Sequence, residues 1–276
     1  LEMPQRIGGG ALPRLRLVNM NHQPKQCVLA PALLESIAER AARGEQSMLL
    51  LNRRGYAPVL ACHACGWKSD CPHCSAHAVF HQIDRTLRCH HCGHSSRVPY
   101  ACPGCGNLDI APIGRGTEQL EEQLVGLLAN ARRADGEPIR VLRLDADSTR
   151  AKGSLEQQLS CMHEGEFDVL VGTQMIAKGH DFRRITLVAS LNVDGGLFAS
   201  DYRAPERLFA LLLQAAGRAG RDADFVANQG TAVELWVQTW YPEHPLFAAL
   251  AQHDYPAFAT QQLEEREAAL MPPYSF

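Results

Sequence analysis

Apolar and polar residues follow one another along the chain in segments that predict helices and strands in turn. Residues 32–44 place apolar side chains at helical spacing and end on Gly44, which is typical of a helix that a glycine terminates. Residues 47–59 open with the apolar run MLLL and continue into a polar loop, which predicts a buried strand. The chain is therefore expected to open with a helix and a buried strand.

The same alternation resumes after residue 108. Strands are predicted at residues 109–113, 139–147, 167–174, 185–194 and 231–238, and helices at residues 117–130, 154–165 and 205–219. Thr117 is expected to cap the first of these helices. Alternating strands and helices indicate an α/β domain with a doubly wound, mostly parallel sheet.

Four CxxC pairs separate these two regions. They hold eight of the ten cysteines: Cys62/Cys65, Cys71/Cys74, Cys89/Cys92 and Cys102/Cys105. A CxxC turn directs two thiolates at one metal ion, and two such turns complete a tetrahedral site of four sulfurs. A disulfide framework is the alternative, but strict CxxC pairing favours two structural zinc ions without an open position for a catalytic water.

The four pairs can be combined in two ways. In a nested arrangement the outer pairs share one ion and the inner pairs share the other, and the 14 residues between Cys74 and Cys89 suit a strand, a turn and a returning strand. In a sequential arrangement only five residues, 66–70, would bring the first two pairs face to face. We expect the nested arrangement because five residues leave little room for that approach.

Charge limits what the cysteine segment can bind. The formal net charge of −3 excludes a wholly basic nucleic-acid binder. The excess of arginine, 23 against four lysines, suits contacts with phosphate, but a coding bias toward arginine would give the same ratio. Residues 61–107 carry four cations and two anions, so eight thiolates and two Zn²⁺ bring the loaded segment to about −2. Contact with a protein partner, or with bases through Trp67, Phe80 and Tyr100, is therefore expected rather than a phosphate clamp.

Two stretches carry candidate phosphate chemistry. In VLVGTQMIAKGHDF, residues 169–182, a predicted strand ends at Gly172 and Thr173, where N–H groups at a helix start can hold a phosphate. A plain strand-to-helix turn would use the same glycine. In QAAGRAGRD, residues 214–222, Arg218 and Arg221 are three apart and are expected on one helix face. Two such arginines suit charge stabilisation on a transferring γ-phosphoryl group, and salt bridges that cap the helix are the structural alternative.

These motifs resemble those of a known family. GTQMIAKGHDF and QAAGRAGR are similar to motifs V and VI of superfamily 2 helicases, and LLLNRRGYAP is similar to motif IV. Eight paired cysteines directly after NRRGYAP resemble the PriA family of bacterial replication-restart helicases, and the resemblance covers nearly everything after about residue 15. It implies a RecA-like second helicase lobe interrupted by a small, zinc-ribbon-like insertion that binds two zinc ions.

The resemblance also implies roles for individual residues. Arg218 and Arg221 would approach the γ-phosphate of ATP in a cleft between two lobes, and Gln214 would line that cleft. Asn52 would lie at the neck of the insertion with its two arginine neighbours. The residues that would contact DNA or couple it to the nucleotide are Gly172, Thr173, Gln174, Lys178, Gly179, Asp181, Thr117, Arg53 and Arg54.

The family pairs this lobe with a first lobe that carries a Walker A loop and a DEAH-type box. This sequence contains neither GxxxxGK[ST] nor DEAH, so we expect a fragment that is inactive by itself, although a homologue that has lost its first lobe would look the same. The expected divisions are an inter-lobe linker (1–31), the first part of lobe 2 (32–60), the zinc-binding insertion (61–107), the rest of lobe 2 (108–243), and C-terminal helices leading to a further domain (244–276).

The function implied by the resemblance is an ATP-dependent 3′→5′ DNA helicase. It would recognise stalled replication forks and initiate primosome assembly in the bacterial cytoplasm, in association with the nucleoid. The implied cofactors are two Zn²⁺, with ATP and Mg²⁺ in the full-length enzyme. The implied partners are branched and single-stranded DNA, PriB, DnaT, single-stranded DNA-binding protein and the first helicase lobe. The alternative from another class is a non-catalytic zinc-ribbon module on an α/β scaffold.

Overall fold

A computed structural model describes most of the chain. The described residues are 12–24, 27–52, 59–62, 64–74, 78–81, 84–89, 92–113, 117–144, 166–177, 182–198 and 201–274. The chain forms two compact units, one from Leu1–Asn52 with Thr117–Phe276 and the other from Arg53–Gly116. Within the described part, no helix combines the length and the apolar character that a bilayer span requires.

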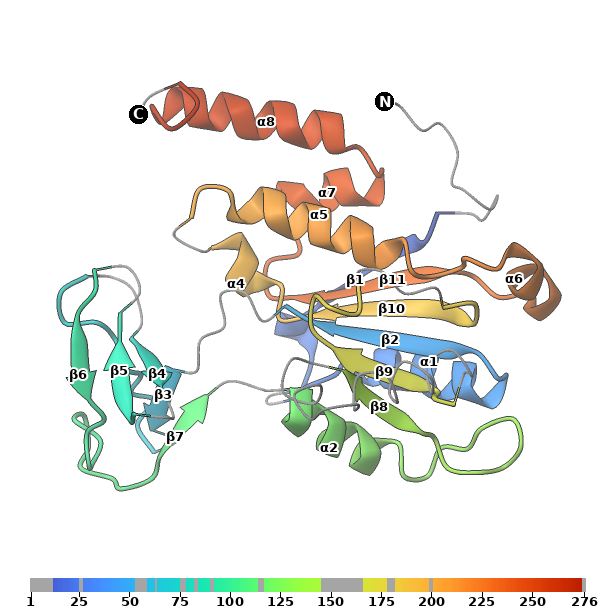
Figure 1. The fold of residues 1–276 in the computed structure, drawn as a ribbon, viewed down its shortest axis with the longest axis horizontal. Coiled ribbons are helices and arrows are strands. Elements are labelled where there is room, and N and C mark those ends of the chain that lie inside the picture. Colours follow the sequence, from blue (N-terminus) through green and yellow to red (C-terminus); the bar gives the residue numbers. More distant parts are fainter. Residues whose placement is uncertain are drawn as a thin grey trace. The chain divides into compact units, whose positions relative to one another are not determined.

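The large unit is built on a six-stranded sheet in which every strand pair is parallel (Figure 1). The strands lie in the order β1 (Arg14–Asn19), β11 (Glu234–Thr239), β10 (Ile185–Leu191), β2 (Gln46–Leu51), β9 (Val169–Gly172) and β8 (Val141–Leu144). Crossovers between sequentially distant strands make the sheet doubly wound. The predicted α/β fold is confirmed.

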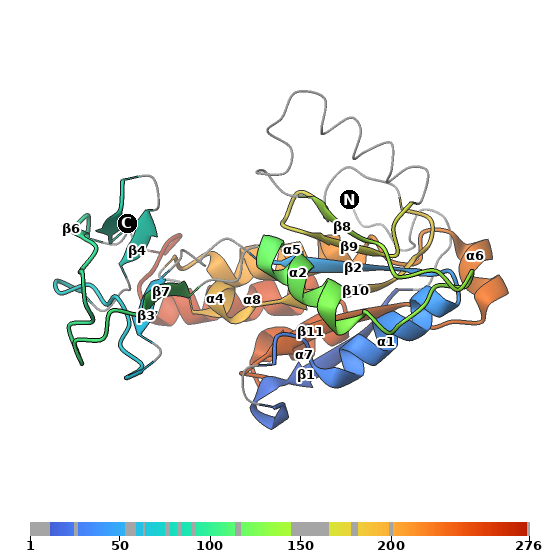
Figure 2. The same ribbon diagram turned by 90° about the horizontal axis from the view of Figure 1, so that it is seen from below.

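Both faces of the sheet are covered by helices, as Figure 2 shows from below. Along β2, Met48 and Leu50 face one apolar cluster, and Leu49 and Leu51 face the other. This alternation explains why the strand reads as a continuous apolar run. The first cluster contains residues of α5 (Ala204–Ala216), α7 (Pro245–Ala251) and α8 (Tyr255–Ala268), and the second contains residues of α1 (Pro31–Ala42) and α2 (Thr117–Leu127).

Three short helices complete the described part of the large unit: η1 (Met20–His22), α4 (Asp194–Leu197) and α6 (Ala223–Gln229). α4 follows β10 directly, whereas α6 precedes β11. Because all strands are parallel, α4 lies at the carboxyl edge of the sheet and α6 leads into its amino edge. The helix expected at residues 154–165 lies outside the described residues.

Two assignments from the sequence were wrong in part. Residues 14–19, expected within a linker, are strand β1 of the sheet, and the alternation of Arg14, Leu15, Arg16 and Leu17 was the available sign of it. The Arg16 guanidinium pairs with Glu234 on β11 at 2.8 Å, so a charged side chain is accommodated beside the sheet. The strand expected at 109–113 is β7 (Ile110–Ile113), but it does not join the large sheet: it pairs antiparallel with β3 (Val59–Cys62). Residue periodicity predicts a strand without predicting its neighbour.

A buried ion group fixes β11 against α1. Arg40 donates to Glu234 at 2.9 Å and lies 3.8 Å from Glu45, and the exposed fractions of all three side chains are 6% or less. Burial acts to raise the pKa of Glu234, but hydrogen bonds from Arg16 and Trp236 and the charge of Arg40 hold it below its usual value. The Glu234 carboxylate therefore stays ionised because its neighbours compensate its desolvation.

The small unit consists of two antiparallel sheets with little apolar core. β3 pairs with β7, and β5 (Thr86–Arg88) pairs with both β4 (Val79–His81) and β6 (Ser95–Arg97). Its buried apolar cluster, within the part that the structure describes, contains only Leu60, Ala78 and Leu87, with Trp67 and Phe80 among the partly buried residues packed against it. A domain of this size with so small a core needs additional cross-links to fold.

Candidate functional site

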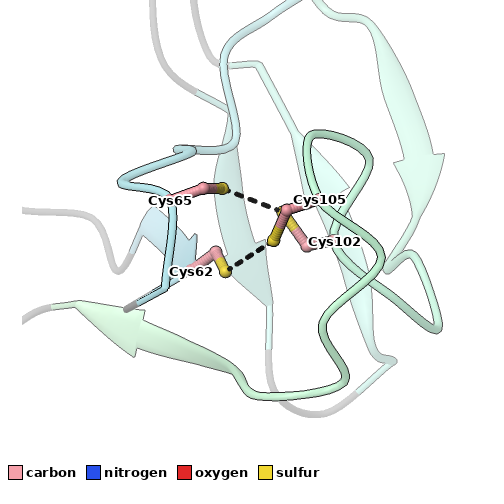
Figure 3. A group of neighbouring side chains, drawn as sticks. All are labelled: Cys62, Cys65, Cys102 and Cys105. Carbon is pink, nitrogen blue, oxygen red and sulfur yellow. Dashed lines mark hydrogen bonds between the residues drawn. The ribbon is translucent and has the colours of Figure 1, made fainter.

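The eight paired cysteines of the small unit form two groups of four sulfurs. In the first group, Cys62 Sγ lies 3.6 Å from Cys105 Sγ, and Cys65 Sγ lies 3.5 Å from Cys102 Sγ (Figure 3). The second group unites Cys71 with Cys92 and Cys74 with Cys89, with both distances 3.5 Å. Within each group all four sulfurs lie within 4.8 Å of one another. The structure thus has the nested arrangement predicted from the spacing.

The sulfur spacing fits a tetrahedral zinc site. Four sulfurs at the usual Zn–S distance of about 2.3 Å are separated from one another by roughly 3.8 Å. The distances of 3.5 and 3.6 Å approach that value and are far longer than a disulfide bond of about 2.05 Å. These eight cysteines are all unbridged, so each group offers four thiolates to one ion.

A repeated turn directs the sulfurs inward. In three of the CxxC pairs a glycine follows the second cysteine, and its N–H donates to the carbonyl of the first cysteine at 2.8–2.9 Å. These glycines, Gly66, Gly93 and Gly106, have φ between 75° and 77°. This left-handed conformation is easily reached only without a Cβ, so the glycine belongs to the CxxCG turn itself. Sequence spacing and backbone chemistry therefore specify the same sites.

Crowded thiols at the first site resist ionising together. The backbone N–H of Cys65 lowers the pKa of Cys62 to about 7. The N–H of Asn107 acts to lower the pKa of Cys105, but its neighbours Cys65 and Cys62 raise it to about 12. A bound divalent cation compensates this repulsion, so metal binding is accompanied by proton release.

The carboxyl edge of the large sheet carries Gly172, from the predicted DNA-contacting set, on the strand next to the one that precedes Asn52, the residue expected at the neck of the insertion. Asn52 follows β2, and Gly172 ends β9, its immediate neighbour in the sheet. A Cβ at Gly172 would lie 2.4 Å from the carbonyl oxygen of Leu144 and 2.6 Å from Ile176, so only glycine allows this approach. Thr173 and Gln174 follow as a half-buried turn. The edge therefore carries a tightly constrained strand end.

Several predicted site residues are not placed by the structure. Arg53, Arg54, Lys178, Gly179 and Asp181 lie outside the described residues. Thr117 is the first residue of α2, as expected of a helix start, and its side chain is outside the description. Their roles stay predictions.

The two motif arginines do not share a helix face, which corrects the expectation from their spacing. α5 ends at Ala216, Gly217 caps it, and residues 217–220 form a turn that contains Arg218. Arg221 follows that turn, is exposed, and donates through Nε to the Gly217 carbonyl at 3.2 Å. Gln214 is exposed in the last turn of α5. Two glycines break the helix before the second arginine, so helical spacing does not apply.

The arginine turn is anchored at the amino edge of the sheet. The N–H of Gly220 donates to the carbonyl of Ile185, the first residue of β10, at 2.7 Å. Gly220 has a φ of 64°, and a Cβ there would lie 2.6 Å from Val233. GTQ and GRAGR therefore occupy opposite edges of one parallel sheet.

Replacing Gly220 by alanine is expected to destabilise the large unit by about 2–4 kcal/mol, since a left-handed φ and a clash with Val233 act together. Gly230→Ala is the matched control. Gly230 has a φ of 60°, but a Cβ added there would meet nothing within 4 Å, so about 1 kcal/mol is expected. Urea denaturation of both zinc-loaded variants measures the difference. Equal losses would show that the contact with Val233 does not anchor the turn.

Two known domain families match this chain. The PriA DNA helicase Cys-rich region domain matches residues 71–97, and the helicase conserved C-terminal domain matches residues 115–223. The second match contains both GTQ and GRAGR. The fold and these matches define a helicase C-terminal domain that carries a Cys-rich, zinc-binding region.

Relatives identify the family. Replication restart protein PriA of Haemophilus influenzae is 44% identical over 276 residues, which cover 100% of this chain and 36% of that protein. Replication restart protein PriA of Bacillus subtilis is 37% identical over 279 residues, covering 100% and 33%. The chain belongs to the family of replication restart protein PriA, and it spans about a third of the length of these relatives.

Among solved structures, that of S. cerevisiae Dbp5 bound to RNA and ADP BeF3 aligns with 88% of this chain and 39% of its own. Its sequence identity is 11% and its TM-score is 0.40.

Proposed function

We propose that this chain supplies the second motor lobe and the zinc-binding region of an ATP-dependent 3′→5′ DNA helicase that acts in replication restart at stalled or abandoned forks. The observation that carries the proposal is the 44% identity to a replication restart protein over 100% of the chain. The match to a helicase C-terminal domain across residues 115–223 favours it over a non-catalytic zinc-ribbon module on an α/β scaffold.

On this proposal, the amino edge of the sheet faces the nucleotide. Arg218 and Arg221 approach the γ-phosphoryl group of ATP and offset the negative charge that develops as it transfers. Gln214, exposed one turn before Arg218, lines the same cleft. ATP with Mg²⁺ supplies the energy when bound between this lobe and a first lobe. The Gly220–Ile185 hydrogen bond ties the arginine turn to β10 and limits how far the turn can shift.

The carboxyl edge is proposed to hold DNA. Gly172, Thr173 and Gln174 contact the DNA backbone through the N–H groups of the half-buried turn after β9. Lys178, Gly179 and Asp181 couple this contact to the nucleotide, while Thr117, Arg53 and Arg54 add phosphate contacts. β9, which ends at the DNA-contacting turn, and β10, which anchors the arginine turn, are separated only by β2. The sheet therefore links the two edges, so that closure of the cleft around ATP at the amino edge displaces the DNA-contacting turn at the carboxyl edge.

The zinc-binding region is proposed to serve as an accessory surface. Two four-cysteine sites hold its small sheets together, and its loaded charge near −2 favours protein contacts over phosphate contacts. PriB, DnaT and single-stranded DNA-binding protein are the proposed partners. Of the aromatic residues considered for base contacts, Tyr100 is 89% exposed, whereas Trp67 and Phe80 pack against the apolar cluster.

Unwinding by the full-length protein tests the motor assignment. Two partial duplexes, one with a 3′ single-stranded arm and the other with a 5′ arm, are each incubated with the protein and ATP. Strand separation is followed by fluorescence. A 3′→5′ motor is expected to separate the duplex that offers a 3′ arm and to require ATP hydrolysis. ATP-independent melting, or hydrolysis that DNA does not stimulate, would reject the proposal.

A further inference from the structure

Three exposed aromatic side chains follow two neighbouring strands at the carboxyl edge of the large sheet. Phe198 follows α4, and Trp240 and Tyr241 follow β11; their exposed fractions are 59%, 52% and 51%. The rings of Phe198 and Tyr241 meet edge to face with their centroids 4.5 Å apart. β10, which leads into α4, is the neighbour of β11, so the segments that follow these two strands lie at the same edge of the sheet (Figure 1).

Hydrogen bonds fix the backbone that carries these rings. Asp194, the first residue of α4, accepts from the hydroxyl of Thr239 and from the N–H of Trp240, the latter at 3.2 Å. The Thr239 hydroxyl in turn accepts the N–H of Tyr241 at 3.0 Å. From the other side, the Asn21 side chain donates to the Trp240 carbonyl at 2.7 Å. The turn is thus held before any ligand arrives, which lowers the entropic cost of binding.

The charges around the turn disfavour a phosphate site. The Asp194 carboxylate lies beneath the turn, and Glu243 follows Tyr241 by two residues. Exposed aromatic rings, in contrast, stack with any nucleic-acid base, because every base has a π face. This surface also shares its sheet edge with the turn after Gly172, which the proposed function assigns to the DNA backbone.

We propose that Phe198, Trp240 and Tyr241 form a base-stacking platform for single-stranded DNA. The proposal rests on the proposed function. It extends it by separating two tasks along one edge: the turn after β9 takes phosphates, and the platform takes base faces. Stacking requires no particular base, so the platform grips DNA without selecting sequence, as translocation requires.

Binding of two oligonucleotides by the zinc-loaded chain tests the platform. One is an oligothymidylate, and the other is an abasic strand of equal length with the same phosphodiester backbone. Single replacements Phe198→Ala, Trp240→Ala and Tyr241→Ala are each expected to weaken oligothymidylate binding by roughly 5- to 100-fold. Binding of the abasic strand is expected to change less than about twofold, since it offers nothing to stack.

Two variants serve as matched controls. Tyr241→Phe keeps the ring, and its loss of oligothymidylate binding is expected to be smaller than that of Tyr241→Ala. Tyr274→Ala removes a tyrosine that is 47% exposed, follows α8 and lies outside the platform, and it is expected to have no effect. Unfolding temperatures of all variants, measured in parallel, verify that the turn remains folded.

The possible outcomes distinguish failure of the platform from failure of the proposed function on which it rests. Unchanged oligothymidylate binding in the three alanine variants would overturn the platform while leaving the DNA-binding role intact. Equal losses on both oligonucleotides would also overturn it, because they would indicate damage to the turn. If the unmodified chain bound neither strand, the DNA-contacting role of this edge would fail and the platform with it.

Discussion

Replacing Arg218 by alanine in the full-length protein is expected to lower DNA-stimulated ATP hydrolysis by about 10³-fold or more, the range that a positioned arginine supplies to phosphoryl transfer. Arg218 lies in the turn between α5 and α6, whose backbone is anchored to β10 at the amino edge of the sheet. Fork binding is expected to stay nearly unchanged, because the proposed DNA contacts lie at the opposite edge.

Two further variants sharpen the Arg218 experiment. Arg218→Lys keeps the charge but loses the planar fork, and it is expected to recover only part of the activity. Arg207→Ala is the matched control, since Arg207 lies near the other end of α5, is exposed and pairs with Asp201. Hydrolysis is measured by phosphate release with forked DNA at saturating ATP. Normal hydrolysis by the Arg218→Ala protein would remove the arginine-finger assignment.

Chelating zinc is expected to unfold the small unit and to leave the large unit folded. Structural zinc binding contributes on the order of 10–16 kcal/mol in small metal-dependent domains, far more than a cluster of Leu60, Ala78 and Leu87 can supply. The large unit has two apolar clusters of its own. Metal analysis should give two zinc ions per chain, and hydrogen exchange after chelation should locate the loss of protection within residues 53–116.

Cysteine variants test the grouping of the ligands. Cys89→Ser is expected to reduce zinc at the site it shares with Cys71, Cys74 and Cys92, while the site formed by the outer pairs keeps its ion. Cys27→Ser is the control, because Cys27 belongs to neither group. A single ion in the unmodified protein, or collapse of the large unit on chelation, would contradict the two-site description.

Local chemistry made part of this structure predictable. The apolar run of β2 and the strand–helix alternation predicted the α/β fold. A strand in a parallel sheet is buried on both faces, so its residues form a continuous apolar run rather than an alternating pattern. The gap between Cys74 and Cys89 predicted the nested pairing because the strands β4 and β5 fit within it. In both cases the determining contacts are set by neighbouring residues and by spacing.

Long-range pairing and backbone breaks were harder to predict. β7 reads as a strand, but its partnership with β3 depends on residues about fifty positions away. The glycine at the end of α5 and the left-handed Gly220 remove Arg221 from the helix, and the G-R-A-G spacing was the available sign of this. The aromatic group of Phe198, Trp240 and Tyr241 was missed because the sequence does not show that these side chains remain exposed.

The antiparallel pairing of β3 with β7 has a consequence for how such a protein can diversify. Val59 lies opposite Ile113, so the outgoing and returning strands are neighbours even though seven of the eight paired cysteines lie between them in the sequence. A segment inserted between neighbouring strands can lengthen, shorten or change its metal ligands without altering the order of strands in the large sheet. A change in the surface of the cysteine segment then leaves the packing of the large sheet intact.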